Sequence, residues 1–158
     1  MSKLNIQQLP KNKDFLKCFT VPKGHKLVYS DINSLEPHVM AHFSQDSGLM
    51  GLYGPGAKKN DVYLFVGAQI DKWKDDILKY YDPFNPTPEG IANAKKHAKA
   101  ARSAVKAPYL GWLYGLGPST LHVDTGIPFE ECKEIMMNID AAFPDIGKFN
   151  GQLKMEWL

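Results

Sequence analysis

The run from residue 91 to 107 most constrains how this chain can fold, because it combines strong helix formers with charges of a single sign. It is rich in alanine and lysine, which favour a helix. No Asp or Glu occurs between Glu89 and Asp124, whereas Lys95, Lys96, Lys99, Arg102 and Lys106 all do. We therefore predict a basic helix here, and a one-sign helix attracts anionic partners such as phosphates.

Two of these cations lie one helical turn apart and precede an apolar surface. At 100° per residue, Arg102, Lys106, Leu110 and Leu113 fall within roughly 80° of one another, and Tyr114 lies at the edge of that arc. Two cations followed by an apolar surface suit a ligand that has a polyphosphate at one end and a base at the other. The competing interpretation is an ordinary solvated basic surface.

Residues 102–115 read RSAVKAPYLGWLYG. This segment resembles motif B, the nucleotide-binding fingers helix of family A DNA polymerases, whose pattern is Arg-x-x-x-Lys-x-x-x-(Phe or Tyr)-Gly-x-x-Tyr-Gly. Every fixed position agrees except Leu110, where the family has an aromatic ring. The resemblance therefore implies a dNTP-binding helix with weaker stacking and altered sugar discrimination.

A second segment, residues 27–46, resembles motif A of the same family. Matching positions are held by Asp31, Glu36, Ala41, His42, Ser44 and Asp46. Residues 5–10, 126–128 and 143–144 also resemble family segments, in the expected order. Residues 60–63, Asn-Asp-Val-Tyr, stand where the family has Asp-Ile-His, so this match is weaker. The similarity covers nearly the whole chain and has a phage-like, divergent character.

The resemblance assigns roles to several residues of motif B. Arg102 and Lys106 are expected to bind the β- and γ-phosphates of the incoming dNTP, and Lys106 is also expected to act in catalysis by protonating the leaving pyrophosphate. Gly111 would let the helix approach the nascent base pair closely. Tyr114 would lie near the templating base, and Leu110 would contact the nucleotide in place of the missing ring.

Motif A is expected to supply the catalytic metal site and sugar selection. Nucleotidyl transfer uses two divalent cations, and Mg²⁺ prefers hard oxygen ligands. We expect Asp31 to be a catalytic metal ligand, with the backbone carbonyl of Ile32 as a second oxygen. By resemblance, Glu36 is the steric gate that crowds the 2′ position of the sugar. His38 and Ser34 replace the family's Arg and Gln, so template-side contacts are expected to differ.

The predicted fold class is α+β. A β-hairpin over residues 15–32, with its turn at Pro22-Lys23-Gly24, would form part of a palm sheet, and helices are expected over 34–45, 62–70 and 128–142. The helix over 34–45 is expected to bury an apolar face, and His42 is expected to pack in the palm core. That apolar face includes Leu35, Val39, Met40 and Phe43. The motif B helix is expected over about 91–117, with Pro108 distorting it. The chain would then divide into a partial palm (1–50) and helical fingers (51–158), with a variable insertion over 71–90.

The expected activity is template-directed DNA synthesis by a partial or split DNA polymerase. The family's second catalytic carboxylate lies in a His-Asp-Glu motif, and that tripeptide does not occur in these 158 residues. A second polypeptide would therefore supply the rest of the palm, and the other partners would be primer-template DNA, dNTP and Mg²⁺. The alternatives are a non-catalytic nucleotide- or DNA-binding module and an inactive gene remnant.

Composition agrees with an intracellular enzyme. Cys18 and Cys132 lie far apart with no CxxC motif, which favours reduced thiols. No apolar run approaches the roughly 18 residues that span a bilayer. We expect a cytoplasmic protein without a membrane partner, located in the host cytoplasm if a phage encodes it.

Overall fold

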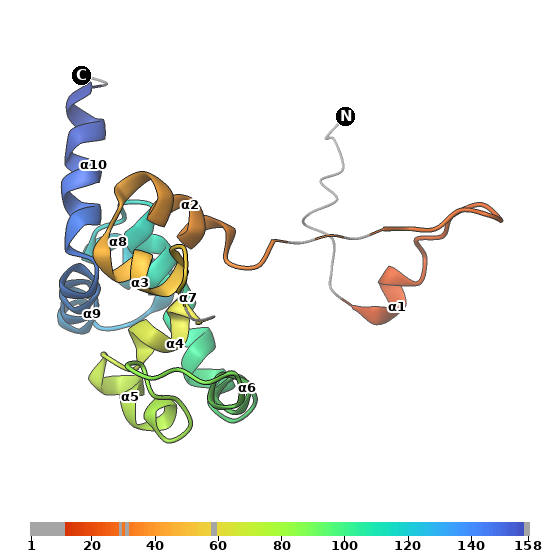
Figure 1. Cartoon of the computed structure of the whole chain (residues 1–158), viewed down its shortest axis with the longest axis horizontal. Coiled ribbons are helices and arrows are strands. Elements are labelled where there is room, and N and C mark those ends of the chain that lie inside the picture. Colours follow the sequence, from red (N-terminus) through yellow and green to blue (C-terminus); the bar gives the residue numbers. More distant parts are fainter. Residues whose placement is uncertain (1–11, 29, 31, 58–59, 157–158) are drawn as a thin grey trace. The chain divides into compact units, whose positions relative to one another are not determined.

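All regular elements in the described part of the chain are helices (Figure 1). This computed structural model describes residues 12–28, 30, 32–57 and 60–156, and the side chains of 15, 16 and 154–156 are left out. The chain divides into two units, residues 1–33 and 34–158. Among the described helices, none combines the length and the apolar character needed to cross a membrane.

The predicted α+β class is wrong, because the expected hairpin does not form strands in the residues described. The first unit contains α1 (Lys13–Leu16) and a turn in which the His25 N–H donates to the Pro22 carbonyl over 3.0 Å, with Gly24 at φ 87°. The turn is thus confirmed, but the described residues on either side of it do not pair as strands. Val28 remains 85% exposed. An isolated two-stranded hairpin is marginally stable without a third strand or a packing surface.

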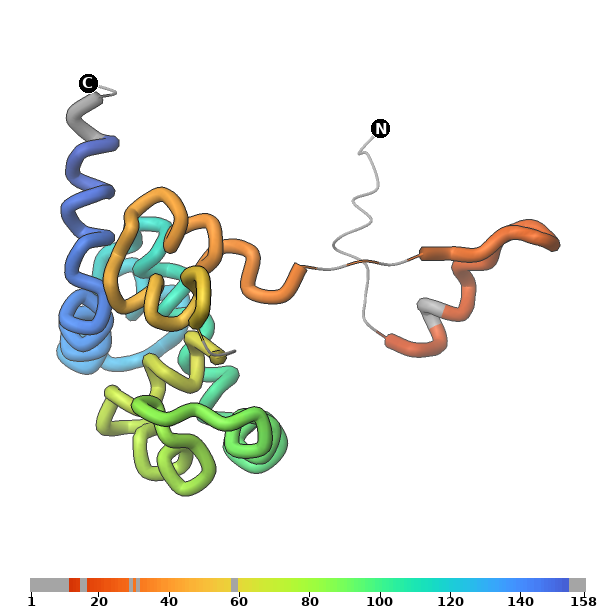
Figure 2. The backbone as a smooth tube through the Cα atoms, in the orientation of Figure 1, coloured from red at the N-terminus to blue at the C-terminus, as the bar shows by residue number. Residues whose placement is uncertain are grey.

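The second unit is a bundle of short helices whose path can be followed in Figure 2. Its elements are α2 (Leu35–Ser44), α3 (Ser47–Tyr53), α4 (Val62–Gly67), α5 (Asp71–Leu78), α6 (Pro88–His97), α7 (Lys99–Leu113), α8 (Pro118–Thr125), α9 (Phe129–Ala142) and α10 (Pro144–Glu156). The predicted helices over 34–45, 62–70 and 128–142 are confirmed by α2, α4 and α9. The predictions missed α3, α5, α8 and α10.

Helix α7 lies at the centre of this unit and contacts α4, α5, α6, α8 and α9. Its buried face includes Val105 and Tyr109, both 0% exposed. The Tyr109 ring packs edge-on against Tyr63 of α4, with centroids 5.7 Å apart, and also against Phe143, at 6.1 Å. Burying one such side chain contributes about 1.5–3 kcal/mol, so the core determines where α7 and its polar residues lie.

The basic run forms two helices instead of one. The predicted helix over about 91–117 is interrupted at Ala98, which has φ −100° and ψ 29°, and the second helix ends at Leu113. Ala98 is buried, and the preceding His97 ring stacks on Tyr80 at 5.2 Å. Pro108 is buried within α7 and does not end it. Local sequence favours continuation through Ala98, so tertiary packing is the reason for the break.

The apolar face predicted for α2 is also wrong in its orientation. Leu35, Val39 and Phe43 are 45%, 45% and 63% exposed, whereas Pro37 and Ala41 are buried. The residues flanking α2, Ser34 and Gln45, both have left-handed backbones. The helix packs on α3, and its fully buried residues are the small ones. His42, expected to be buried, is exposed.

Candidate functional site

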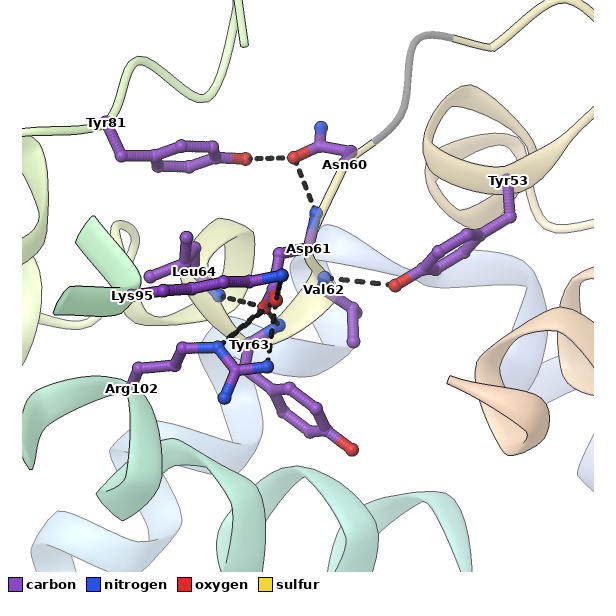
Figure 3. Close-up of polar contacts among 9 residues, drawn as sticks. All are labelled: Tyr53, Asn60, Asp61, Val62, Tyr63, Leu64, Tyr81, Lys95 and Arg102. Carbon is purple, nitrogen blue, oxygen red and sulfur yellow. Dashed lines mark hydrogen bonds and ion pairs between the residues drawn. The ribbon is translucent and has the colours of Figure 1, made fainter. Parts of the chain in front are cut away.

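The carboxylate of Asp61 joins three helices at the N-terminus of α4 (Figure 3). Asp61 is only 4% exposed, and it caps α4 by accepting hydrogen bonds from the backbone N–H groups of Tyr63 and Leu64 at 3.1 and 3.2 Å. An Asp before an apolar helix is a common capping arrangement. The same carboxylate pairs with Arg102 of α7 and Lys95 of α6 at 2.8 and 3.0 Å.

The two cations that surround Asp61 determine its ionisation. Burial by itself would raise the pKa of the Asp61 carboxyl, but hydrogen bonds and positive charge from Arg102 and then Lys95 outweigh it and lower that pKa. Asp61 is therefore ionised at neutral pH. The segment that presents it is held in turn by Asn60, whose side-chain oxygen accepts from the Asp61 N–H at 2.8 Å and from the Tyr81 hydroxyl at 2.6 Å.

The predicted phosphate-binding residues converge on a single aromatic ring. The Arg102 guanidinium lies 5.1 Å from the centroid of the Tyr63 ring, and the Lys106 ammonium lies 5.2 Å from the same centroid. Both distances fall within the range of cation–π contacts. Lys106 is exposed, and the Arg102 side chain is 21% exposed. Two cations one turn apart therefore present an accessible positive surface beside α4.

The remaining motif B residues lie at the C-terminal end of α7. Leu110 is half-buried, and Tyr114 is 69% exposed. The aromatic side chain next to Leu110 in sequence, Tyr109, points into the core. The core position of Tyr109 is explained by its contacts with Tyr63 and Phe143.

The two glycines of motif B end the helix in this structure. Gly115 has φ 78°, its N–H donates to the Trp112 carbonyl, and the Leu116 N–H donates to the Gly111 carbonyl, both over 2.9 Å. These bonds form a Schellman motif, in which glycine relieves the strain of a left-handed residue. A Cβ at Gly111 would lie 3.2 Å from the Leu116 side chain, so Gly111 also allows close packing of this turn.

The motif A residues divide between the two units. Asp31 lies outside the described residues, and Ile32, in the first unit, is 65% exposed. Glu36 lies in the first turn of α2, and its charge, after the larger effect of burial, raises the pKa of the Tyr63 hydroxyl. Glu36 thus lies within electrostatic range of the same Tyr63 that contacts Arg102 and Lys106. The structure brings these residues together without bearing on Asp31.

Three residues of this site were not predicted from the sequence: Asp61, Lys95 and Tyr63. The capping pattern of Asp61 was a usable signal, but its pairing with Arg102 joins residues 41 positions apart. A metal centre is not evident among the described residues, where no group of three or more His, Cys, Asp or Glu side chains could hold an ion.

Comparison with known proteins gives a consistent result. The model of DNA polymerase family A matches residues 1–157. The DNA polymerase of Escherichia phage T5 is 27% identical over 93% of this chain and 18% of its own length. DNA polymerase I of Synechocystis is 26% identical over 96% of the chain and 13% of its own length. The thermostable DNA polymerase I of Thermus thermophilus is 25% identical over 90% of the chain and 15% of its own length. The chain thus spans less than a fifth of these relatives.

Proposed function

The chain belongs to DNA polymerase family A, and we propose that it forms the nucleotide-binding fingers and part of the palm of a template-directed DNA polymerase. The observation that supports this proposal most strongly is the convergence of Arg102 and Lys106 on the Tyr63 ring. Two adjacent cations with solvent access can each pair with phosphate oxygens of a triphosphate.

In this proposal, Arg102 and Lys106 bind the β- and γ-phosphates of the dNTP. They neutralise the charge that develops on the leaving pyrophosphate, and Lys106, the more exposed of the two, donates a proton to it. Leu110 and the exposed Tyr114 ring receive the sugar and base beside the template strand. Glu36, at the start of α2, limits the space at the 2′ position of the sugar.

The proposed metal ligands are Asp31 and the backbone carbonyl of Ile32. The described residues neither complete nor replace this site, so the assignment depends on the motif A resemblance. Bound Mg²⁺ ions would activate the primer 3′-hydroxyl and compensate the triphosphate charge. The second carboxylate, absent from these 158 residues as a His-Asp-Glu tripeptide, is proposed to come from a second polypeptide that carries the rest of the palm.

A non-catalytic nucleotide- or DNA-binding module is the second candidate. It is favoured by the fact that Arg102, Lys106, Tyr63 and Glu36 all belong to the unit of residues 34–158, whereas Asp31 belongs to the other unit. The phosphate-binding surface can therefore form without the proposed metal ligand.

The decisive experiment is single-nucleotide primer extension with Mg²⁺. The chain is assayed alone and then mixed with a C-terminal palm fragment of a related polymerase, and dNTP binding is measured in parallel. We expect extension in the mixture and its loss in Asp31→Ala, with dNTP affinity nearly unchanged.

Two further variants serve as controls. Lys106→Ala should weaken dNTP binding, whereas Lys133→Ala, which removes an exposed lysine of α9, should leave it intact. Extension that persists in Asp31→Ala would contradict the metal-ligand role. Binding without extension in any mixture would favour the non-catalytic module.

A further inference from the structure

The hydrogen bonds that the Arg102 guanidinium makes with described residues all lie along one edge. Its Nε donates to both oxygens of Asp61, at 3.2 and 3.1 Å, and its Nη2 donates to Oδ2 at 2.8 Å. This is a side-on, bidentate contact between guanidinium and carboxylate, the geometry that gives arginine its directional strength. Two of the five N–H groups are used, and the position of the inner edge is determined.

The face of the guanidinium is restrained as well. Tyr63 lies beneath it, with its ring centroid 5.1 Å from Cζ, and Tyr63 is only 8% exposed. The Tyr63 ring is itself fixed edge-on against the fully buried Tyr109. Because one edge and one face are restrained by buried groups, the guanidinium has little freedom to rotate, and its outer edge has a defined direction.

That outer edge is available for a ligand. In Figure 3 the third guanidinium nitrogen of Arg102, Nη1, points away from the Asp61 carboxylate. Within the described part of the chain, Arg102 donates hydrogen bonds only through Nε and Nη2. Nη1 therefore retains two N–H donors and Nη2 retains one. Such a pair of terminal nitrogens can bind phosphate oxygens bidentately.

We propose that Arg102 uses both edges at once: its inner edge stays on Asp61 while its outer edge binds the triphosphate of the incoming nucleotide. Asp61 and Tyr63 are then positioning residues, which act on the ligand through Arg102. This inference rests on the proposed dNTP-binding function. It extends that function by identifying the residues that orient the arginine and the nitrogen atoms that contact phosphate.

The burial of Asp61 explains why phosphate does not displace it. An Asp61 carboxylate that is 4% exposed would lose its main partner if Arg102 turned toward the ligand, and an unpaired buried charge is strongly unfavourable. Lys95, at 3.0 Å, supplies further positive charge to the carboxylate. The Asp61 carboxylate pairs with two cations, Lys95 and Arg102, and a third, Lys106, lies over the Tyr63 ring. These cations outnumber Asp61, so the surface attracts the triphosphate.

The two-edge arrangement requires arginine specifically. A lysine at this position has one ammonium group, which cannot satisfy Asp61 and at the same time present a second edge to a phosphate. We therefore measure, by isothermal titration calorimetry, the binding of dATP and of inorganic tripolyphosphate to the wild type, Arg102→Ala, Arg102→Lys and the double variant Arg102→Lys/Asp61→Asn. Lys133→Ala is the charge-matched control.

We expect Arg102→Lys to bind both probes about as weakly as Arg102→Ala does, roughly tenfold or more below the wild type, the size expected for lost charged hydrogen bonds. Adding Asp61→Asn should restore much of the binding, because it releases the lysine ammonium while the asparagine still caps α4. If charge alone mattered, Arg102→Lys would bind within about threefold of the wild type, and this result would overturn the inference.

A measurement on the unaltered protein avoids dependence on variant folding. In a ¹⁵N-labelled sample, the Arg102 Nε–H resonance should remain protected from exchange after tripolyphosphate is added, while the Nη resonances shift. Loss of Nε–H protection would show that phosphate replaces Asp61 and would overturn the inference. If the wild type binds neither probe, the proposed function fails, whereas binding that Arg102→Lys retains refutes only the two-edge arrangement.

Discussion

Helices α2 and α7 contain most of the residues with predicted roles, but the rest of the molecule holds them very differently. Helix α7 is surrounded by α4, α5, α6, α8 and α9, whereas the main contacts of α2 are with α3 and α10. Tyr109 of α7 is 0% exposed, and Phe43 of α2 is 63% exposed. A buried face on α7 thus fixes the polar residues on its other side.

This difference affects the two halves of the candidate site. Arg102 and Lys106 lie on a helix whose position the core determines, and Asp61 and Tyr63 restrain them further. Glu36 lies on α2, whose apolar residues are largely exposed. The proposed phosphate-binding residues are therefore held firmly within the second unit, whereas the proposed sugar-selecting residue depends on a helix with fewer contacts. The following predictions test that contrast.

The largest difference should appear when one aromatic side chain is removed from each helix. Tyr109→Ala deletes a fully buried ring of α7 and should lower the free energy of unfolding by about 3–5 kcal/mol. Phe43→Ala on α2 should lower it by less than about 1 kcal/mol, because that ring is mostly in solvent. Urea denaturation of both variants measures the two values. Equal losses would contradict the contrast between the helices.

Removing the Asp61 carboxylate should have the next largest effect. Asp61→Ala removes the cap of α4 and leaves Arg102 and Lys95 without their buried partner, so we expect a loss of about 2–3 kcal/mol in the free energy of unfolding. Asp61→Asn keeps a capping oxygen and should lose less. If Asp61→Asn is as damaging as Asp61→Ala, the charge contributes more than the cap.

The same carboxylate should make stability depend on pH. The pKa of Asp61 is lowered in the folded protein, so the folded state keeps it ionised at a pH where the unfolded chain begins to bind protons. The contribution of Asp61 to the free energy of unfolding is fully present above its pKa in the unfolded chain, about 3.9. It is lost as the pH falls through the lower pKa of the folded state. As the pH is lowered from about 5 to 2, the melting temperature should fall less steeply in Asp61→Asn than in the wild type.

Two glycines provide a smaller test of packing density. A Cβ at Gly67 would lie 2.4 Å from Ile77 Cδ1 and 2.9 Å from Val105 Cγ2 of α7, whereas a Cβ at Gly51 of α3 would have no atom within 4 Å. Gly67→Ala should therefore destabilise by about 1–3 kcal/mol. Gly51→Ala should be neutral or stabilising by up to about 1 kcal/mol. Chemical denaturation compares the two, and similar values would argue against tight packing beneath α7.

The smallest effect is expected from Tyr109→Phe. The Tyr109 hydroxyl is buried and has no hydrogen-bond partner among the described residues. An unsatisfied buried hydroxyl is unfavourable, so its removal should leave the free energy of unfolding unchanged or raise it by up to about 1 kcal/mol. A clear loss of stability would reveal a partner for the hydroxyl, such as an ordered water molecule.

Helix formation could be predicted where local sequence and periodicity agree. The helices corresponding to α2, α4 and α9 were predicted correctly, and the basic character of α6 and α7 follows directly from residues 91–107. The β-hairpin was predicted wrongly because its turn residues and β-branched arms are locally suitable, yet strands need neighbours to pair with. The face of α2 was also mispredicted, because hydrophobicity alone does not say which residues an adjacent helix covers.

The sequence by itself determined the family, the helical character of the motif B segment, and the one-turn separation of Arg102 and Lys106, because these depend on nearby residues and on fixed motif spacing. Only the tertiary structure decided that the basic run breaks at Ala98, that Tyr109 enters the core, and that Asp61 pairs with Arg102. These features depend on contacts between residues far apart in the chain, 41 positions for the last pair, and local propensity contains no information about them.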